Sequence, residues 1–406
     1  MSDFYSGSYG SRKKQQRSAF GLLADAVMMV VTIPVILLFV TLLFVPHVNP
    51  NSSGVFSILG LIAPFVYAAM LVMTLYWIVR WRRVAVPIVL IAFVGSFSLS
   101  AFYRPELKRY YEKSYPSDAI KVLTYNTRSF INDDGERCLD SIVEMIRAVR
   151  PDVVLFQEMG FSHKMDSLLN PLKFTPLPKS LSRVELSPAI YSRHPIVMAE
   201  RIDSMKNFVW ADVVIRKDTL RLFNLHLHTT AIRRDEGQYI ENHEYLEETG
   251  DMDKLRSMVN RLSDNNKLRA MQADTIADII AASPYPVIVC GDFNDTPISY
   301  TYRRVSRKLK DAFREVGRGY SYTYRGFFDM LRIDYVLFDK RFTALGYDVV
   351  DSWGWVDRVR RQDTIRVRKY GNKVSVEQDG SRGPYNVDYS DHYPVLVHLE
   401  MNGTNR

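Results

Sequence analysis

The sequence at residues 287–295 reads VIVCGDFND, a short apolar run followed at once by polar residues. The run at 287–290 has the length and the β-branched content of a buried strand. Gly291 then separates this strand from Asp292 and Asn294. Because a rigid buried strand can hold such side chains in fixed positions, the pattern predicts that Asp292 and Asn294 belong to a site at a strand end.

The same arrangement recurs along the chain, with a carboxylate, an amide or an imidazole at the end of an apolar run. Polar side chains that repeatedly end buried strands indicate a site rather than a solvated surface. The further members of this set are Asn126 after 120–125, Glu158 after 152–156, His226 at the end of 220–226, Asp334 within 333–338, and Asp391 and His392 before 395–399.

The pattern outside the site predicts an α/β fold of two packed sheets. Many short strands with few long helices between them favour sheets packed face to face with helices outside, rather than a doubly wound parallel sheet. Further strands are expected at 189–192 and 209–215, and helices at 140–149, 265–282 and 300–313. Two stretches are expected to be long excursions, a polar one at 230–264 and a hairpin insertion at 351–388.

The first third of the chain has a different composition. Residues 20–45, 55–79 and 84–102 are almost uninterruptedly apolar. A membrane-spanning helix needs ~20 apolar residues, so we expect a module of three spanning helices at 20–102. A signal peptide is disfavoured because its apolar core would be shorter and would not be followed by further runs. The expected order is therefore a basic N-terminus at 1–19, this membrane module, a linker at 103–118 and a catalytic domain at 119–406.

The Lys/Arg distribution predicts the orientation of this module, because cytoplasmic loops carry an excess of these residues. The loop at 46–54 has none, which places it outside, with the N-terminus in the cytoplasm. Three spans then put the catalytic domain on the periplasmic or extracellular side, at the inner membrane in a Gram-negative cell. The Lys/Arg residues at 104–113 favour instead a cytoplasmic position for the start of the catalytic domain. If the third run lay on the membrane surface and did not cross it, the catalytic domain would also be on the cytoplasmic side. The residues that set this orientation are Arg12, Lys13, Lys14, Arg17, Arg80, Arg82 and Arg83.

Nearly all of the net charge of +8 belongs to the membrane-proximal part. Residues 1–117 carry 11 Lys/Arg and 4 Asp/Glu, or a net charge of +7. The remaining residues carry 42 Lys/Arg and 41 Asp/Glu, or a net charge of +1. A nucleic-acid-binding domain is usually strongly basic, so this balance gives nucleic acid as a partner no support. Cys138 and Cys290 show no metal-binding or CxxC spacing and are interpreted as buried or reduced thiols, with a single disulfide left open.

These residue types suit metal-assisted hydrolysis of a phosphate ester. A hard cation such as Mg²⁺ prefers oxygen ligands, which Glu158, Asn126 and Asp391 offer. A carboxylate must then position a water, and donors must neutralise charge on phosphorus. The residues of suitable type for this work are Asp292, Asn294, His226 and His392, with Tyr191 and Arg193 as further candidate phosphate contacts.

Six strings occur in an order that is typical of one known family: LTYNT, LFQEM, NLHLH, GDFND, RIDYVL and YSDHYP. Together they resemble the successive motifs of the endonuclease/exonuclease/phosphatase family, which has a DNase I-like fold. The resemblance covers the chain from about residue 119 onward. It implies a four-layer α/β/β/α sandwich with the site at one edge.

The same resemblance implies a role for each site residue. Glu158 would be the principal metal ligand, with Asn126 and Asp391 in or near the metal shell. Asp292 would activate the water, Asn294 would hold the water and the phosphate, and His226 would donate to a phosphate oxygen. His392, held by Asp334, would contact the phosphate, and the choice of proton acceptor between Asp292 and this pair stays open. Mg²⁺ is the expected metal, with Mn²⁺ and Ca²⁺ as alternatives. Arg128 stands where some family nucleases carry an acidic residue, which weakens a second metal site.

Three functions follow from these observations. We expect foremost a membrane-anchored, metal-dependent phosphoester hydrolase that acts on a substrate near the bilayer, with the lipid bilayer and a phosphoester as partners and no obligate protein partner. The alternatives are a tethered extracytoplasmic nuclease and a non-catalytic membrane scaffold with a pseudoenzyme domain. Trp353, Trp355 and the basic residues at 358–373 could contact lipid headgroups or bases, or form a solvated hairpin.

Overall fold

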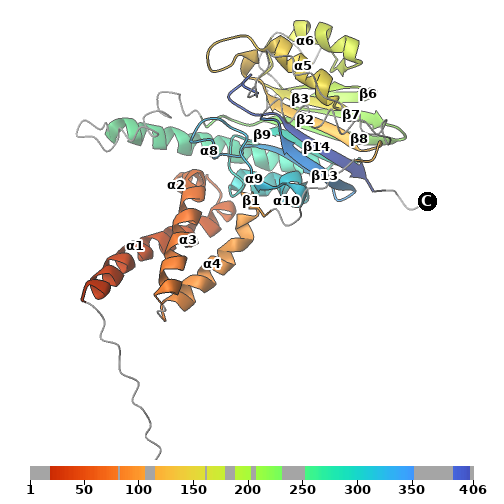
Figure 1. The fold of residues 1–406 in the computed structure, drawn as a ribbon. Helices are drawn as coiled ribbons and strands as arrows, with labels where there is room; N and C mark the ends of the chain where they lie inside the picture. The colour runs from red at the N-terminus through yellow and green to blue at the C-terminus, as the bar shows by residue number, and fades with distance from the viewer. Residues whose placement is uncertain are drawn as a thin grey trace, which may run out of the picture.

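Two six-stranded sheets form the larger part of the molecule (Figure 1). The computed structural model describes residues 19–80, 83–105, 115–160, 162–178, 188–202, 207–230, 252–351 and 387–402. In each sheet two neighbouring strands are parallel and the other neighbours are antiparallel. The two parallel pairs are β2–β3 in one sheet and β8–β9 in the other.

The first sheet has the order β13-β14-β2-β3-β5-β4 and the second has the order β10-β12-β9-β8-β7-β6. The strands of the first sheet are β13 (Phe342–Val349), β14 (Val395–Met401), β2 (Ile120–Asn126), β3 (Val153–Gln157), β5 (Ala189–Ser192) and β4 (Thr175–Pro176). Those of the second are β10 (Lys310–Asp311), β12 (Asp334–Phe338), β9 (Val287–Asp292), β8 (Asp218–His226), β7 (Phe208–Ile215) and β6 (Ile196–Arg201).

The sheets pack face to face and helices cover their outer faces (Figure 1). The inner layer is built from alternate residues of the central strands, such as Val122, Leu155, Leu222 and Ile288, all of them fully buried. Helices α5 (Leu139–Val149) and α6 (Ser162–Leu169) pack on the first sheet, and α8 (Met252–Ala281) and α9 (Tyr300–Ser306) pack on the second. This arrangement confirms the predicted four-layer α/β/β/α sandwich.

The structure corrects several predicted elements. The helix expected at 300–313 is wrong, because β10 separates α9 from α10 (Ala312–Val316). The helix is interrupted at Asp311. This residue pairs with β12, and its side chain caps α10 by accepting from the backbone N–H of Phe313. Helix α8 begins at Met252, so residues 252–264, the last part of the excursion expected at 230–264, are helical. Strands β6 and β13 escaped prediction, since β6 is an exposed edge strand and β13 contains a bulge at Gly346.

The N-terminal part is a bundle of helices that lies against the sandwich (Figure 1). Two helical segments, Ala19–His47 and Phe56–Val79, are long and apolar enough to cross a membrane by length and composition, whereas α4, where a third span was expected, has only 15 residues. The helices are α1 (Ala19–Phe44), η1 (Val45–His47), α2 (Gly54–Ile58), η2 (Leu59–Ile62), α3 (Ala63–Val79) and α4 (Ala85–Leu99).

Close packing holds this bundle together. Gly95 of α4 lies against Phe39 of α1 so tightly that a Cβ there would come within 2.1 Å of the Phe39 ring. Trp77 of α3 donates its indole N–H to Thr32 of α1 at 2.9 Å. Small residues and buried hydrogen bonds of this kind are typical of helix contacts in membranes.

The bundle is connected to the sandwich by strand pairing, within the region expected to be a linker at 103–118. The chain forms a short strand directly after α4, where β1 (Tyr103–Arg104) pairs with β11 (Gly319–Tyr320). Residues 106–114 and most of the hairpin insertion expected at 351–388, with Trp353 and Trp355, lie outside the described residues.

Candidate active site

The two parallel strand pairs end at the same edge of the sandwich, and this edge collects the predicted polar residues. In the first sheet, Asn126 at the end of β2 lies beside Gln157, which directly precedes Glu158. In the second sheet, Asp292 at the end of β9 lies between His226 of β8 and Asp334 of β12. Because each residue sits at a fixed register position, the geometry of the site is set by the two sheets.

A buried polar bridge fixes the spacing of the sheets beneath this edge. The side-chain amide of Gln157 donates to Asn224 Oδ1 at 2.6 Å and to Thr124 Oγ1 at 3.0 Å. Asn224 in turn donates to the carbonyl of Phe156 at 2.8 Å. Gln157 belongs to one sheet and Asn224 to the other, so this bridge holds Glu158 and His226 at a constant separation.

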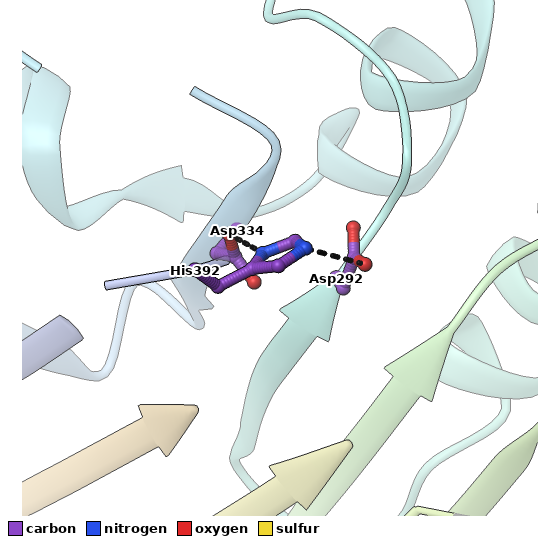
Figure 2. A group of neighbouring side chains, drawn as sticks. All are labelled: Asp292, Asp334 and His392. Carbon is purple, nitrogen blue, oxygen red and sulfur yellow. Dashed lines mark hydrogen bonds and ion pairs between the residues drawn. The ribbon is translucent and has the colours of Figure 1, made fainter. Parts of the chain in front are cut away.

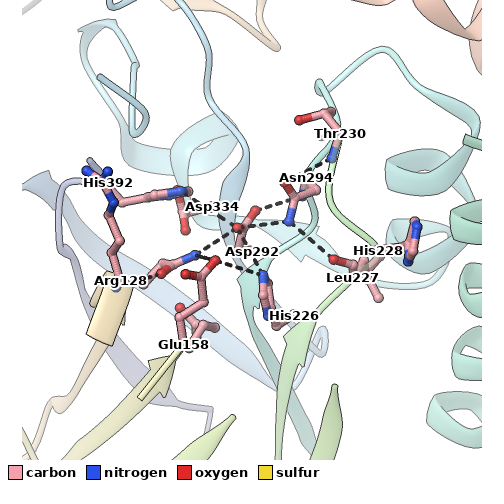
Figure 3. A network of polar contacts seen from close by, with 12 residues as sticks. Arg128, Glu158, His226, Leu227, His228, Thr230, Asp292, Asn294, Asp334 and His392 are labelled. Carbon is pink, nitrogen blue, oxygen red and sulfur yellow. Dashed lines mark hydrogen bonds and ion pairs between the residues drawn. The ribbon is translucent and has the colours of Figure 1, made fainter. Parts of the chain in front are cut away.

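Asp292 is the most heavily bonded carboxylate of the site (Figure 3). Asn294 donates to it twice, through its backbone N–H at 2.7 Å and its side-chain amide at 3.0 Å. Asn126 donates from the other sheet at 3.1 Å. The preceding Gly291 has φ +129°, and a Cβ there would lie 1.9 Å from the carbonyl oxygen of Leu225, so only glycine fits.

His392 and Asp334 form a hydrogen-bonded pair next to Asp292 (Figure 2). His392 Nδ1 is 2.9 Å from Asp334 Oδ2, and its Nε2 faces Asp292 Oδ2 at 3.8 Å. The Thr323 hydroxyl accepts from the backbone N–H of Asp334 at 3.0 Å and keeps this carboxylate in place. Burial lowers the pKa of His392, but the adjacent carboxylates Asp334 and Asp292 outweigh it, so that its pKa is raised and the ring is cationic.

Glu158 lies across the edge from this pair (Figure 3). Its Oε1 is 3.3 Å from His226 Nε2 and accepts from the Asn126 amide at 3.2 Å. Burial raises the pKa of Glu158, yet His226 and Asn126 together lower it to about 2, which leaves a charged carboxylate that is one-third exposed. The backbone of Glu158 has φ +49°, a strained conformation that aims the side chain into the site.

Asp391 and Arg128 form the outer side of the site. The Ser390 hydroxyl donates to the carbonyl of Asn126 at 2.8 Å and to Asp391 at 3.2 Å, which places Asp391 beside the end of β2. Arg128 Nε lies 3.8 Å from Asp391 Oδ2, and Arg128 Nη1 donates to Asp133 at 2.6 Å. A guanidinium therefore stands next to the residue predicted to assist the metal.

The donor set fits a hard divalent cation. Glu158 supplies an ionised and partly exposed carboxylate, and Asn126 adds an amide oxygen at the same strand end. Asp292, Asp334 and His392 form a second group whose ligand atoms lie within 4.8 Å of one another. This second group is already linked by a chain of contacts from Asp334 through His392 to Asp292, so it is better suited to proton handling than to metal binding.

Sequence reasoning missed some residues of the site and misplaced others. Thr323 and Tyr324 come from an irregular segment, and the Tyr324 ring lies 5.1 Å from that of His392, a contact that no motif announces. Tyr191 is wrong as a phosphate contact because its hydroxyl is buried and donates to Asp166 at 2.7 Å. Arg193 is wrong as well, since its backbone N–H bonds the carbonyl of Asp152, at the opposite end of β3 from Glu158. Both cysteines are buried and free, so no disulfide links them.

The comparisons with known proteins agree with this arrangement. Residues 123–392 match the sequence model of the Endonuclease/Exonuclease/phosphatase family. The chain belongs to this family. Its members are typically phosphoesterases or nucleases, so a hydrolase is the coarse function of this member. Residues 25–102 match the sequence model of a domain of unknown function (DUF8431), and no curated protein sequence matches the chain.

Solved structures with a related fold include a humanised D. rerio TDP2, with 15% identity and a TM-score of 0.45 over 70% of this chain and 100% of that one. A mannosyl-6-phosphatase of Bacteroides thetaiotaomicron VPI-5482 has 16% identity and a TM-score of 0.44 over 70% of this chain and 100% of that one. A beta toxin of Staphylococcus aureus has 17% identity and a TM-score of 0.43 over 68% and 99%.

Proposed function

We propose that this family member is a divalent-metal-dependent phosphoesterase that is anchored in a membrane and hydrolyses a phosphoester at the membrane surface. One observation carries the catalytic part of this proposal. Asp292 is held by Asn294 and Asn126 next to the His392–Asp334 pair, while the charged Glu158 faces the same space from the other sheet. A base, a cationic donor and an anionic metal ligand therefore converge on one strand edge.

Each residue of this set has a distinct task in the reaction. A carboxylate can accept about four hydrogen bonds, and Asp292 accepts three within the described residues, so it can also take a proton from a water. Because His392 is bonded to Asp334 and cationic, it serves as a donor to a phosphate oxygen and leaves Asp292 as the proton acceptor. Asn294 directs the lone pairs of Asp292, and His226 is placed to donate from the Glu158 side.

Glu158 and Asn126 would hold the metal, with Asp391 and its neighbour Arg128 at the outer side. When bound, a divalent cation supplies charge that stabilises the developing negative charge on phosphorus. The site contains more carboxylates than cations among Glu158, Asp292, Asp334, Asp391, Arg128 and the two imidazoles, which favours one added cation.

The helical bundle supports the membrane part of the proposal. The helical segments Ala19–His47 and Phe56–Val79 are long enough to span, and many of their apolar side chains, such as Phe20, Val30 and Leu71, are largely exposed. Such an exposed apolar surface is expected for lipid contact and is unfavourable in water. Helix α4 packs against both α1 and α3 and leads back to the sandwich, so it would cross with them. The N-terminus and the catalytic domain would then lie on opposite sides, the latter periplasmic or extracellular.

An aromatic cluster supports a substrate at the membrane surface. Phe65 in the first turn of α3 packs edge-on against Phe327 and Phe328, with ring centroids 6.2 and 5.8 Å away. These two phenylalanines follow Tyr324, which contacts His392. Phe328 is 43% exposed. The segment next to the site is therefore continuous with the end of a proposed membrane helix, and exposed apolar side chains such as Phe328 favour the boundary between headgroups and acyl chains.

The test is an assay of the full chain in nanodiscs with three substrates: a soluble chromogenic phosphodiester, a phospholipid in the disc, and a labelled DNA oligonucleotide. We expect Mg²⁺-dependent hydrolysis of the lipid and the chromogenic ester, loss with a chelator, and loss by at least about a thousandfold in Asp292→Ala. Glu158→Gln should raise the Mg²⁺ concentration that gives half-maximal rate. Cleavage of the oligonucleotide alone would establish the nuclease instead, and no hydrolysis of any of the three would refute the enzyme.

A further inference from the structure

Two fully buried arginines lie beside the catalytic strand ends, and each is linked to the N-terminal part of the chain, Arg269 through Asn266 and Arg332 through a direct hydrogen bond. Arg269 comes from α8, and Arg332 lies two residues before the first residue of β12. A buried guanidinium has five N–H donors and is costly to bury unless they find acceptors. The acceptors of these two arginines therefore determine how firmly the neighbouring chain is held.

Arg269 holds the segment that follows Asp292. Its guanidinium donates to the backbone carbonyl of Asn294 and, at 3.0 Å, to that of His228. It also lies 3.5 Å from Asp295. Asn294 in turn orients Asp292, the proposed base. A shift of Arg269 would therefore move Asp292 through one intervening residue.

One asparagine connects Arg269 to the helical bundle. The side-chain oxygen of Asn266 accepts from Arg269, and its amide nitrogen donates to the Ser57 hydroxyl at 2.6 Å. Ser57 belongs to α2, and both Ser57 and Asn266 are buried. Arg269 requires the oxygen end of this amide, and the Ser57 acceptor holds the opposite N–H₂ end. Without Ser57 the buried N–H₂ group loses its acceptor, and Asn266 is no longer held toward Arg269 from the bundle side.

Arg332 makes the second connection. Its two terminal nitrogens bond Asp311 at 3.2 and 2.9 Å, and one of them also donates to the carbonyl of Ala101 at 2.9 Å. Ala101 lies two residues after the end of α4. Arg332 is two residues from Asp334, the carboxylate that holds His392. The chain at the end of the bundle thus supplies one acceptor to a cation next to the second catalytic carboxylate.

We propose that the N-terminal helical bundle is a positioning part of the active site, because it holds Asn266, an acceptor of Arg269, and supplies a backbone acceptor to Arg332, and so fixes the strand ends that carry Asp292 and Asp334. The fit between the parts is tight. A Cβ on Gly60 of η2 would lie 2.8 Å from the hydroxyl of Thr296, in the segment held by Arg269. The kinetic readout of this inference rests on the proposed phosphoesterase activity.

The test is Ser57→Ala in the full chain, with Ser96→Ala as the matched control. Both serines lie in N-terminal helices and bond the carbonyl three residues earlier, but Ser96 is exposed and, within the described residues, has no side-chain partner in the sandwich. With the chromogenic ester we expect Ser57→Ala to lower kcat by about tenfold with KM within about twofold, because the base is misplaced while the phosphate site persists. Ser96→Ala should match the wild type.

Two further measurements separate positioning from simple loss of stability. Amide hydrogen exchange at residues 293–296 should be about fivefold faster or more in Ser57→Ala than in Ser96→Ala, a readout that does not depend on activity. The double variant Ser57→Ala/Asn266→Asp should recover kcat, since a carboxylate presents only acceptors to Arg269 in either orientation. Equal kcat and equal exchange in Ser57→Ala and Ser96→Ala would overturn the inference. An inactive wild type would refute the proposed function. The comparison of amide hydrogen exchange would still test whether the bundle positions residues 293–296.

Discussion

Replacing Asp334 by asparagine should damage catalysis far more than folding. The Asp334 carboxylate lies 2.9 Å from His392 Nδ1, and both side chains are buried. Its other oxygen has no hydrogen-bond partner among the described residues, so the hydrogen bond that this carboxylate accepts from a side chain comes from His392. Asparagine removes this charge, and its N–H₂ group can face Nδ1 and stabilise the opposite tautomer.

The size of this effect follows from the contact. A hydrogen bond to a charged group contributes about 1.5–3 kcal/mol, which corresponds to a fall in kcat of about 10- to 150-fold. KM should change little, because Glu158 and the metal that it would hold are untouched. The measurement is the steady-state rate with the chromogenic ester at saturating Mg²⁺, together with the melting temperature.

Asp339→Asn is the matched control for this experiment. Asp339 follows the other end of β12 and bonds Arg341 at the surface, at 2.9 Å. Exposed pairs of this kind contribute about 0–1 kcal/mol, so the control should retain wild-type kcat. If Asp334→Asn kept kcat within about twofold of that control, the assignment of His392 as a charged donor would be wrong.

Three other perturbations test separate parts of the structure. Arg128→Ala should lower kcat/KM by about tenfold at low Mg²⁺ and recover partly at high Mg²⁺, because added metal can replace the cation beside Asp391; a deficit unchanged by Mg²⁺ would contradict this role. Gly291→Ala forces a Cβ to within 1.9 Å of a backbone oxygen and should destabilise the fold by more than about 3 kcal/mol in thermal unfolding. Burial opposes the ionised form of Asp152, but His194 and the Lys121 amide lower its pKa, so its stabilising contribution is present above about pH 4 and lost as pH falls further. The melting-temperature difference between wild type and Asp152→Asn should therefore shrink below that pH, and a constant difference would contradict the ionic origin.

Much of the fold and the site could be predicted because the decisive residues are local. The central strands are short apolar runs, most of them followed by a polar side chain. This pattern is local and can be recognised without knowing what packs around it. Asp292, Asn294 and Glu158 follow such runs and His392 precedes one, and the structure brings all four to one edge.

The rest depended on partners that are distant in the chain. The local sequence places Asp311 in a helix. Its actual position depends on an ion pair with Arg332, which is buried beside it. Arg269 appears to be an ordinary polar residue of a long helix, and nothing near it in sequence announces that its acceptors are the carbonyls at Asn294 and His228. Long-range pairs of this kind override local propensity.

The bridge between Gln157 and Asn224 has a consequence for how this sequence can vary among its relatives. Each amide is fully buried and each supplies the partner that the other needs, so a change at one position leaves an unsatisfied polar group that costs about 1–3 kcal/mol. Substitution at both positions by apolar side chains of similar volume removes that cost. The two positions should therefore be inherited as a single character, kept together or replaced together, although they are 67 residues apart.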